Sequence, residues 1–229
     1  MTSLLHQRTS SPALLGHVLK RETEFAMSRE TVTVPGGDGA ERKLIVGQVI
    51  AMILFDIDNI AITPAGGNTG NGALGTLTLG TEAKQGDYAV TCVAASADGG
   101  TFQVVDPDGY RLPDATVGVA YVHKQLNFTI TDGATDWAVG DSITVTVPEG
   151  SGHVVEFNQD AVDGTQRAHG FMAQELTVAS GDTAQAQVIK RDAVAADTGL
   201  IWPADIEQGE KDIGLAQLAA RNIQVRTGG

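Results

Sequence analysis

The stretch Tyr88-Ala-Val-Thr-Cys-Val-Ala94, followed by Phe102-Gln-Val104, decides the fold class. Its larger apolar residues recur at every second position, which is the spacing of strands that bury one face. Between the two segments, Asp98-Gly-Gly100 supplies residues that favour a tight turn. These residues predict an antiparallel hairpin, and Cys92 is expected in its core.

The same period of two continues on both sides of this hairpin. Further turn sequences occur at Asp106-Pro-Asp-Gly109 and at Asp132-Gly133. Short strands separated by such turns are typical of a compact antiparallel sandwich. We expect six strands in this region, at about 74–79, 87–95, 101–105, 117–122, 126–131 and 142–147.

A change in composition predicts that this region is an inserted domain. Residues 66–149 carry only three basic residues against ten acidic ones, and Gly-rich segments flank them on both sides. We therefore predict an inserted domain at 66–149, a discontinuous core formed by 31–65 and 150–229, and an N-terminal segment at 1–30. That segment contains apolar residues and is expected to be a short helix or an extended arm that becomes ordered on a partner.

The predicted core is also rich in strands, with one helix. The best helix candidate is 208–221, which has acidic residues early and Arg221 late, with Ile213, Leu218 and Ala219 available for an apolar face. The chain is thus predicted to be mainly β with a minor helix. Strands are expected at 31–34, 43–54, 153–157, 174–178 and 186–189, with a closing strand at 223–225.

Composition excludes several classes of protein. The chain has 229 residues and a formal net charge of −13, which argues against nucleic-acid binding because that requires clustered Lys and Arg. The longest apolar run, Leu44–Phe55, is too short to span a bilayer, so no membrane association is expected. A single cysteine excludes an intrachain disulfide.

No motif in the sequence predicts catalysis or a bound cofactor. Gly70-Asn-Gly-Ala-Leu-Gly75 matches a dinucleotide-binding pattern literally, but a strand rather than a helix is expected after it. Asp106 and Asp108 are expected in a turn, with a weak cation site as the alternative reading. We therefore expect no enzyme activity, no cofactor and no metal.

Several segments together resemble a known family. Thr198-Gly-Leu-Ile-Trp-Pro-Ala-Asp205, the helix at Lys211–Arg221 and Ile223-Gln-Val-Arg226 resemble the end of the head decoration protein D of lambda-like phages. Near the N-terminus, three segments are similar to the corresponding part of longer members of that family: Leu15-Gly-His-Val-Leu-Lys20, Ser28–Val34 and Leu44-Ile-Val-Gly-Gln-Val49. The segment 163–178 is also similar to the family. The predicted insert resembles a β-rich segment found in phage head proteins, and short family members lack it.

The resemblance implies a structural function and specific partners. Such proteins are trimers on the exterior of the expanded head, at local three-fold positions. There they hold neighbouring major capsid subunits against the pressure of packaged DNA. This implies a virion component assembled in the host cytoplasm, with the major capsid protein and further copies of itself as partners.

Apolar residues suggest where these contacts lie, because exposed apolar clusters usually have a partner. Trp202, with Ile201 and Pro203, is either ordinary core or a trimer contact. The predicted capsid contact consists of Leu15, Val18, Leu19, Phe25, Thr31 and Val32.

An alternative function is a binding module whose inserted domain recognises a glycan or a host surface.

Overall fold

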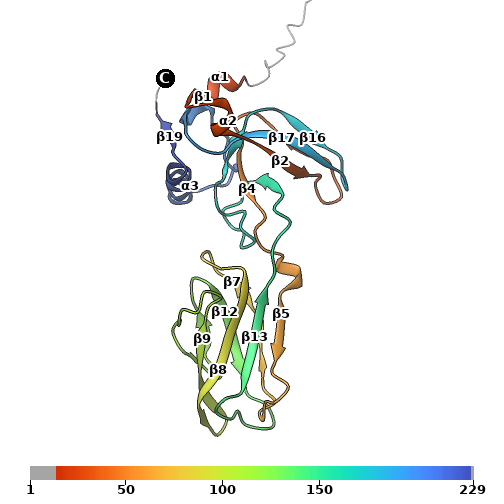
Figure 1. Cartoon of the computed structure of the whole chain (residues 1–229), viewed down its shortest axis with the longest axis vertical. Coiled ribbons are helices and arrows are strands. Elements are labelled where there is room, and N and C mark those ends of the chain that lie inside the picture. Colours follow the sequence, from red (N-terminus) through yellow and green to blue (C-terminus); the bar gives the residue numbers. More distant parts are fainter. Residues whose placement is uncertain (1–13, 228–229) are drawn as a thin grey trace, which may run out of the picture. The chain divides into compact units, whose positions relative to one another are not determined.

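A computed structural model of the chain describes residues 14–227. It consists of two compact units, the first formed by Met1–Ile50 with Ala168–Gly229 and the second by Ala51–Arg167. Most elements are strands in antiparallel sheets, and the helices are few, so the prediction of a β-rich α+β fold is confirmed (Figure 1). No helix within the described range is long and apolar enough to cross a membrane.

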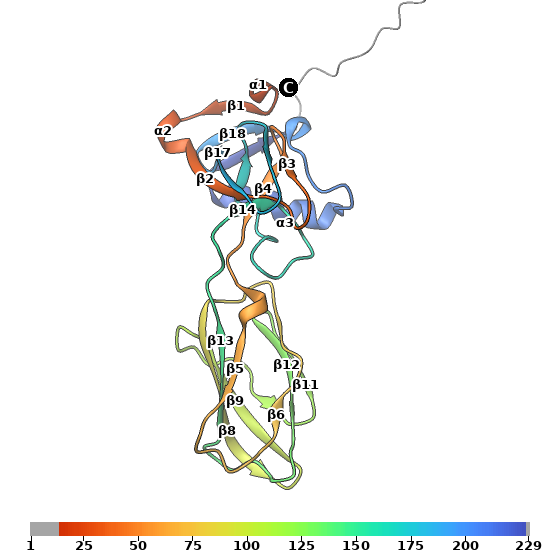
Figure 2. The same cartoon turned by 90° about the vertical axis from the view of Figure 1, so that its right-hand side faces the viewer.

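The second unit contains two antiparallel sheets (Figures 1 and 2). One has the order β10 (Ala115–Thr116), β9 (Gly99–Val105), β8 (Gly86–Ser96), β13 (Ser142–Val147) and β5 (Ala61–Pro64). The other has the order β11 (Ala120–Val122), β12 (Leu126–Thr131) and β6 (Ala73–Leu74), and β7 (Thr78–Leu79) also pairs with β12.

Alternating side chains from both sheets form one hydrophobic core in this unit. Cys92 lies in this core, as predicted, and is 1% exposed. Trp137 is also buried and meets the ring of Phe102 edge to face, with the ring centroids 5.2 Å apart. The buried residues on the strands include Tyr88, Val90, Phe102, Val104, Leu126, Phe128, Ile130, Ile143, Val145 and Val147.

Two of the predicted strands are interrupted. The segment 74–79 forms β6 and β7, because Leu74 pairs with Ile130 whereas Thr78 pairs with Asn127, which leaves one extra residue on the β6–β7 side. Such an extra residue breaks the ladder as a bulge does. The segment 117–122 begins with a turn at Gly118, whose φ of 75° lies in the left-handed region, so the strand β11 starts after it.

The compact units have different boundaries from those expected from composition. Strand β5 precedes residue 66, yet it pairs with β13, with Ile62 opposite Val145. A segment cut at 66 and 149 would therefore lose the edge strand of the larger sheet. The composition changed at the Gly-rich segment after β5, whereas the folded unit extends over Ala51–Arg167.

The other strands form three sheets. The largest has the order β14 (Val154–Glu156), β4 (Val49–Met52), β15 (Gly170–Met172), β17 (Thr183–Ile189) and β2 (Arg29–Pro35). A second contains β3 (Arg42–Leu44) and β16 (Leu176–Val178). The third has the order β1 (Leu19–Glu22), β18 (Ala193–Ala196) and β19 (Ile223–Arg226).

The predicted long strand at 43–54 is divided into β3 and β4 by the loop that contains Gly47. Gly47 has a φ of 85°, and a Cβ atom there would lie 2.8 Å from Val18 Cγ2 and overlap Gly199 O. Only glycine fits this position without strain. The loop thus brings Val18 and Gly199 close to the start of β4.

The described helices are α1 (Leu15–Val18), α2 (Phe25–Ser28) and α3 (Gln208–Ala220), with short 3-10 turns at Ile57–Asn59 and Asp197–Gly199. Helix α3 confirms the predicted helix and begins with a capping box between Glu207 and Glu210. The predicted apolar face was wrong in two of its three residues, because Ile213 and Ala219 are exposed while Leu218 is buried together with Gly214. Strand β19 then pairs in parallel with β18.

Candidate interaction surfaces

The part of the N-terminal segment that the structure describes is folded onto the first unit. Strand β1 pairs antiparallel with β18, with Glu22 opposite Ala193, and Val18 of α1 is 2% exposed. Of the two alternatives expected for 1–30, a short helix or an extended arm, the range 15–28 contains the short helices α1 and α2 with β1 between them. Residues 1–13 of the predicted arm lie outside the described residues.

Three large apolar side chains in the described part of this segment are exposed. Leu14, Phe25 and Met27 are 59%, 55% and 52% exposed. The Arg29 guanidinium lies 4.3 Å from the centroid of the Phe25 ring and donates two hydrogen bonds to the Glu22 carboxylate, at 2.9 and 3.0 Å. This arrangement fixes the position of Phe25 without covering it.

The six residues predicted for the capsid contact do not share one environment. Val18 and Val32 are buried inside the protein, so their side chains have almost no surface to offer a partner. Leu15 and Leu19 are half-buried, whereas Phe25 and Thr31 are exposed. The alternation in β2 explains why neighbouring Thr31 and Val32 differ, since adjacent side chains of a strand point to opposite faces.

The three residues predicted for the trimer contact lie in the connection between Gly199 and α3. Ile201 exchanges backbone hydrogen bonds of 2.9 Å with Gly47 and Val49, which holds this connection against the loop before β4. The Ile201 side chain is 37% exposed, and Trp202 and Pro203 are half-buried. The segment is therefore rigidly attached and keeps part of its apolar surface accessible.

A second set of polar groups surrounds Arg221 in the first unit. Arg221 Nη2 lies 2.8 Å from His169 Nδ1. A guanidinium has no acceptor atom, so the His169 nitrogen accepts and the imidazole is neutral. Burial, followed by the charges of Arg221 and Lys190, lowers the pKa of His169 to about 4. Burial also lowers the pKa of Arg221, with a further contribution from Arg191.

One carboxylate neutralises two of the neighbouring cations. Both oxygens of Glu30 accept from Lys190 Nζ at 2.8 Å, and Oε2 also accepts from Arg191 at 3.3 Å. The hydrogen bond from Lys190 is the main reason why the pKa of Glu30 is lowered. Arg221 has no ion pair with any residue in the range 14–227.

In the second unit, Asp106 and Asp108 form an ion-paired turn. Lys84 Nζ contacts both carboxylates, and the buried Asp106 also accepts from the backbone N–H groups of Asp108 and Tyr110 at 3.0 and 2.9 Å. Burial opposes ionisation of Asp106, but these donors together lower the pKa of its carboxyl. The Lys84 ammonium thus occupies the place considered for a cation, and the turn reading is the one the geometry supports.

Asp141 holds together two loops of the second unit. Its carboxylate accepts hydrogen bonds from the backbone N–H groups of Thr69, Gly70 and Ala138, at 2.8, 2.8 and 2.9 Å. The residue is only 5% exposed. Burial opposes ionisation, but the three donors outweigh it and lower the pKa of Asp141.

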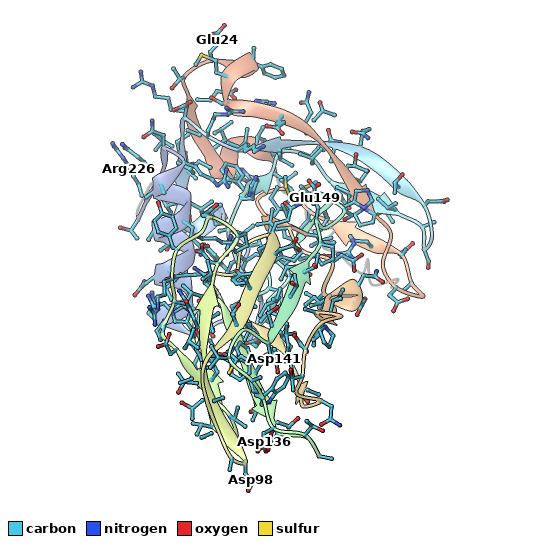
Figure 3. All side chains as sticks on the ribbon, turned by 60° about the horizontal axis from the view of Figure 1, so that its bottom comes forward. Glu24, Asp98, Asp136, Asp141, Glu149 and Arg226 are labelled. Carbon is cyan, nitrogen blue, oxygen red and sulfur yellow. The ribbon has the colours of Figure 1, made fainter. Side chains whose placement is uncertain are left out.

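One group of acidic side chains could hold a metal ion. Carboxylate oxygens of Asp98, Asp132 and Asp136 lie within 4.8 Å of one another. Figure 3 labels Asp98 and Asp136, which lie at the same end of this unit. Carboxylate oxygens suit hard cations such as Ca²⁺, which takes six to eight oxygen ligands at about 2.3–2.6 Å. Asp132 and Asp136 share the connection between β12 and β13, whereas Asp98 lies in the turn between β8 and β9, so the spacing in the sequence does not predict the group.

Comparison with known proteins gives one match that spans both units. The family model described as "Bacteriophage lambda head decoration protein D" matches residues 9–223. No curated protein matches the chain.

Some solved structures share a weak likeness with the chain. The flagellar protein FlgL of Xanthomonas campestris matches with a TM-score of 0.31 and 19% identity over 48% of this chain and 33% of its own. FlgL of Legionella pneumophila matches with a TM-score of 0.30 and 16% identity, over 46% of this chain and 36% of its own. The hook junction protein FlgK of Burkholderia pseudomallei matches with a TM-score of 0.32 and 19% identity, over 56% of this chain and 21% of its own. The chain therefore spans about a third or less of these proteins, and such low TM-scores support no argument.

Proposed function

Because the chain belongs to the bacteriophage lambda head decoration protein D family, and is thus a component of the phage head, we propose that it stabilises that head from outside. In this proposal, trimers bind the exterior of the expanded head at local three-fold sites. They contact the major capsid protein and oppose the pressure of packaged DNA. The protein is made in the host cytoplasm and acts as a structural part rather than as an enzyme.

The observation that carries this proposal is the extent of the family match. It covers 9–223, which includes the exposed apolar residues of the N-terminal segment and the segment around Trp202. An isolated match to one short motif would not link both surfaces to one function. The Phe25 ring is held against the guanidinium of Arg29, which is itself ion-paired with Glu22, and this supports a contact that is prepared before binding.

We assign the capsid contact to the exposed part of the N-terminal segment, with Phe25 and Met27 on α2 and with Leu14, Leu15 and Leu19 at the other end of β1. Their exposed apolar surface gives a reason for association. Each Å² of apolar surface that is removed from water on binding contributes about 25 cal/mol of favourable free energy. Leu15 and Leu19 contribute only the part of their surface that remains accessible.

The test is titration of the full chain onto emptied capsids. Binding should saturate at the local three-fold sites and raise the temperature at which the capsids are disrupted. Phe25→Ala should weaken this binding by about 10-fold or more, since a buried aromatic contact contributes over 1 kcal/mol. The matched control is Val122→Ala, which removes an apolar side chain that is 81% exposed on the second unit. Absence of binding by the unmodified protein would contradict the proposal.

The trimer contact is proposed for Ile201, Trp202 and Pro203. Ile201→Arg adds a charge to this surface. For a trimer that forms in solution, the variant should reduce the mass of the free protein measured by analytical ultracentrifugation. For a trimer that forms only on the capsid, it should reduce the amount of protein bound to the capsid. Ile213→Arg is the control, because Ile213 is also exposed but lies on α3. If both variants keep the mass of the unmodified protein, the contact lies elsewhere.

A second candidate function concerns the second unit. It has its own hydrophobic core and exposes Tyr110 and Val122, at 68% and 81%. A separate folded unit of this kind suits a binding module that recognises a glycan or a host surface. A glycan array with the unit 51–167 tests this function, and loss of a signal in Tyr110→Ala would locate the site.

A further inference from the structure

Five of the chain's 15 basic residues lie around two adjoining pockets in the first unit. The first pocket has a volume of about 430 Å³ and the second of about 270 Å³, and both are lined by Asp192 and Asn222. We call this the cationic surface, and define it by Arg21, Lys190, Arg191, Arg221 and Arg226. The chain as a whole has a net charge of −13, so this concentration of cations is unusual within it.

The three-stranded sheet β1-β18-β19 determines how these cations are spaced. Arg21 pairs with Val194, which in turn pairs with Gln224, so the three residues lie across neighbouring strands. Arg21, Gln224 and Arg226 all line the second pocket, which places them on one face of the sheet. Neighbouring strands are about 4.8 Å apart, so Arg21 and Arg226 project from strands about 10 Å apart. Figure 3 labels Arg226 on its strand.

Three of the five cations form no ion pair within the described part of the chain. Glu30 pairs with Lys190 and Arg191, but Arg21, Arg221 and Arg226 have no ion pair with residues 14–227. Asp192, the carboxylate that lines both pockets, accepts a hydrogen bond from the Asn222 side chain at 3.0 Å.

The environment of Arg221 favours an incoming anion. Arg221 is half-buried, with Nη2 directed at the neutral His169; the charge of Arg191 opposes its ionisation, while Glu30, which forms no ion pair with it, favours ionisation. Burial without a direct ion pair makes a charge unfavourable, and a carboxylate would remove that penalty with paired hydrogen bonds. Arg is better suited than Lys to such planar, two-point contacts.

We propose that the cationic surface binds an acidic segment of a protein partner, with one carboxylate on Arg221 and another between Arg21 and Arg226. In an extended segment, carboxylates two or three residues apart are separated by about 7–10 Å, so a short segment can place one carboxylate in each of the two adjoining pockets. This inference is independent of capsid decoration, since it rests only on the pockets and their charges.

A protein segment is favoured over nucleic acid for two reasons. Neither pocket is lined by an aromatic side chain on which a base could stack. In addition, the net charge of −13 repels a long polyanion that extends beyond the pockets, whereas a short acidic segment places few charges outside them.

The test uses the full chain and a fluorescently labelled hexaglutamate peptide, with hexaglutamine as the uncharged control. Anisotropy should show saturable binding of hexaglutamate at about 20 mM NaCl and weaker binding at about 300 mM. The double variant Arg21→Gln/Arg226→Gln should bind hexaglutamate with an affinity reduced by about 10-fold or more. Its matched control is Lys43→Gln/Lys124→Gln, which removes the same charge from exposed sites outside the cationic surface.

Arg221 is tested separately because it also contacts His169. Arg221→Gln should weaken hexaglutamate binding, while Arg221→Lys, which keeps the charge, should retain part of it. Circular dichroism confirms that each variant is folded. The proposal is overturned if hexaglutamate does not bind, if both double variants bind equally, or if hexathymidylate or polyphosphate binds more tightly than hexaglutamate.

Discussion

Replacing Asp141 with alanine should destabilise the second unit by about 3–5 kcal/mol and leave the first unit unchanged. Asp141 is 5% exposed and is the shared acceptor for backbone donors from two loops. Alanine removes this acceptor and leaves the donors of Thr69, Gly70 and Ala138 without their partner. The loops that meet beside Trp137 should then separate.

The magnitude follows from the three hydrogen bonds. A hydrogen bond to a charged group contributes about 1.5–3 kcal/mol, and a buried donor left unsatisfied costs about 1–3 kcal/mol. Three such bonds would sum to more than the expected value, but Thr69 is exposed and water can replace part of its loss. Asp141→Asn keeps one acceptor oxygen and should cost about half as much as alanine.

The two tryptophans allow each unit to be followed separately. Trp137 lies in the second unit and is 2% exposed, whereas Trp202 lies in the first unit. Urea unfolding followed by fluorescence in a Trp202→Phe background therefore reports on the second unit, and a Trp137→Phe background reports on the first. The free energy of unfolding and its urea dependence are then compared with and without Asp141→Ala.

The control is Asp58→Ala, because Asp58 is an exposed acidic residue of the same unit. It should change the free energy of unfolding by less than about 0.5 kcal/mol. A loss below about 1 kcal/mol for Asp141→Ala, or a loss equal to that of Asp58→Ala, would refute the reasoning. So would an equal effect on the first unit.

Three further predictions test other parts of the structure. Folding lowers the pKa of His169 from 6.5 to about 4. Between pH 6.5 and about pH 4 the unfolded state therefore binds more protons than the folded state, so the first unit should lose stability as the pH falls through this range. The loss should be about 1–2 kcal/mol after allowance for partial exposure, and His169→Gln should abolish it in urea unfolding measured at several pH values. Circular dichroism should show that 51–167 folds alone, whereas 66–149, which lacks β5, should be less stable or unfolded. Gly47→Ala should lower the melting temperature of the first unit, because a Cβ atom there has a strained φ and approaches Val18; an unchanged melting temperature would contradict this account.

The strands of the second unit were predictable where one face is buried. Tyr88, Val90 and Cys92 alternate with more exposed residues, so their spacing alone identifies β8. The same argument fails for β5, whose four residues are all exposed. It is an edge strand identified only by its pairing with β13, and such pairing depends on residues about 80 positions later in the chain.

The N-terminal segment shows a similar limit. Its apolar residues were expected to contact a partner, yet Val18 is buried by the loop at Gly47 and by Gly199. The sequence contains no local sign of this packing, because the contacting residues are far apart in the chain. Phe25 remains exposed because Arg29 lies against its ring rather than over the whole side chain. Apolar character alone therefore could not separate core residues from candidate contacts.

The charge of the chain illustrates why composition could not locate the cationic surface. A net charge of −13 describes an average, and this average argues correctly against a surface that is basic throughout. The five cations come from β1, from the turn between β17 and β18, and from the end of α3 with β19, so they are scattered in the sequence. They meet because β1 and β19 pair with opposite edges of β18. An acidic chain can thus carry a local site for an acidic partner, and only the strand order shows where that site lies.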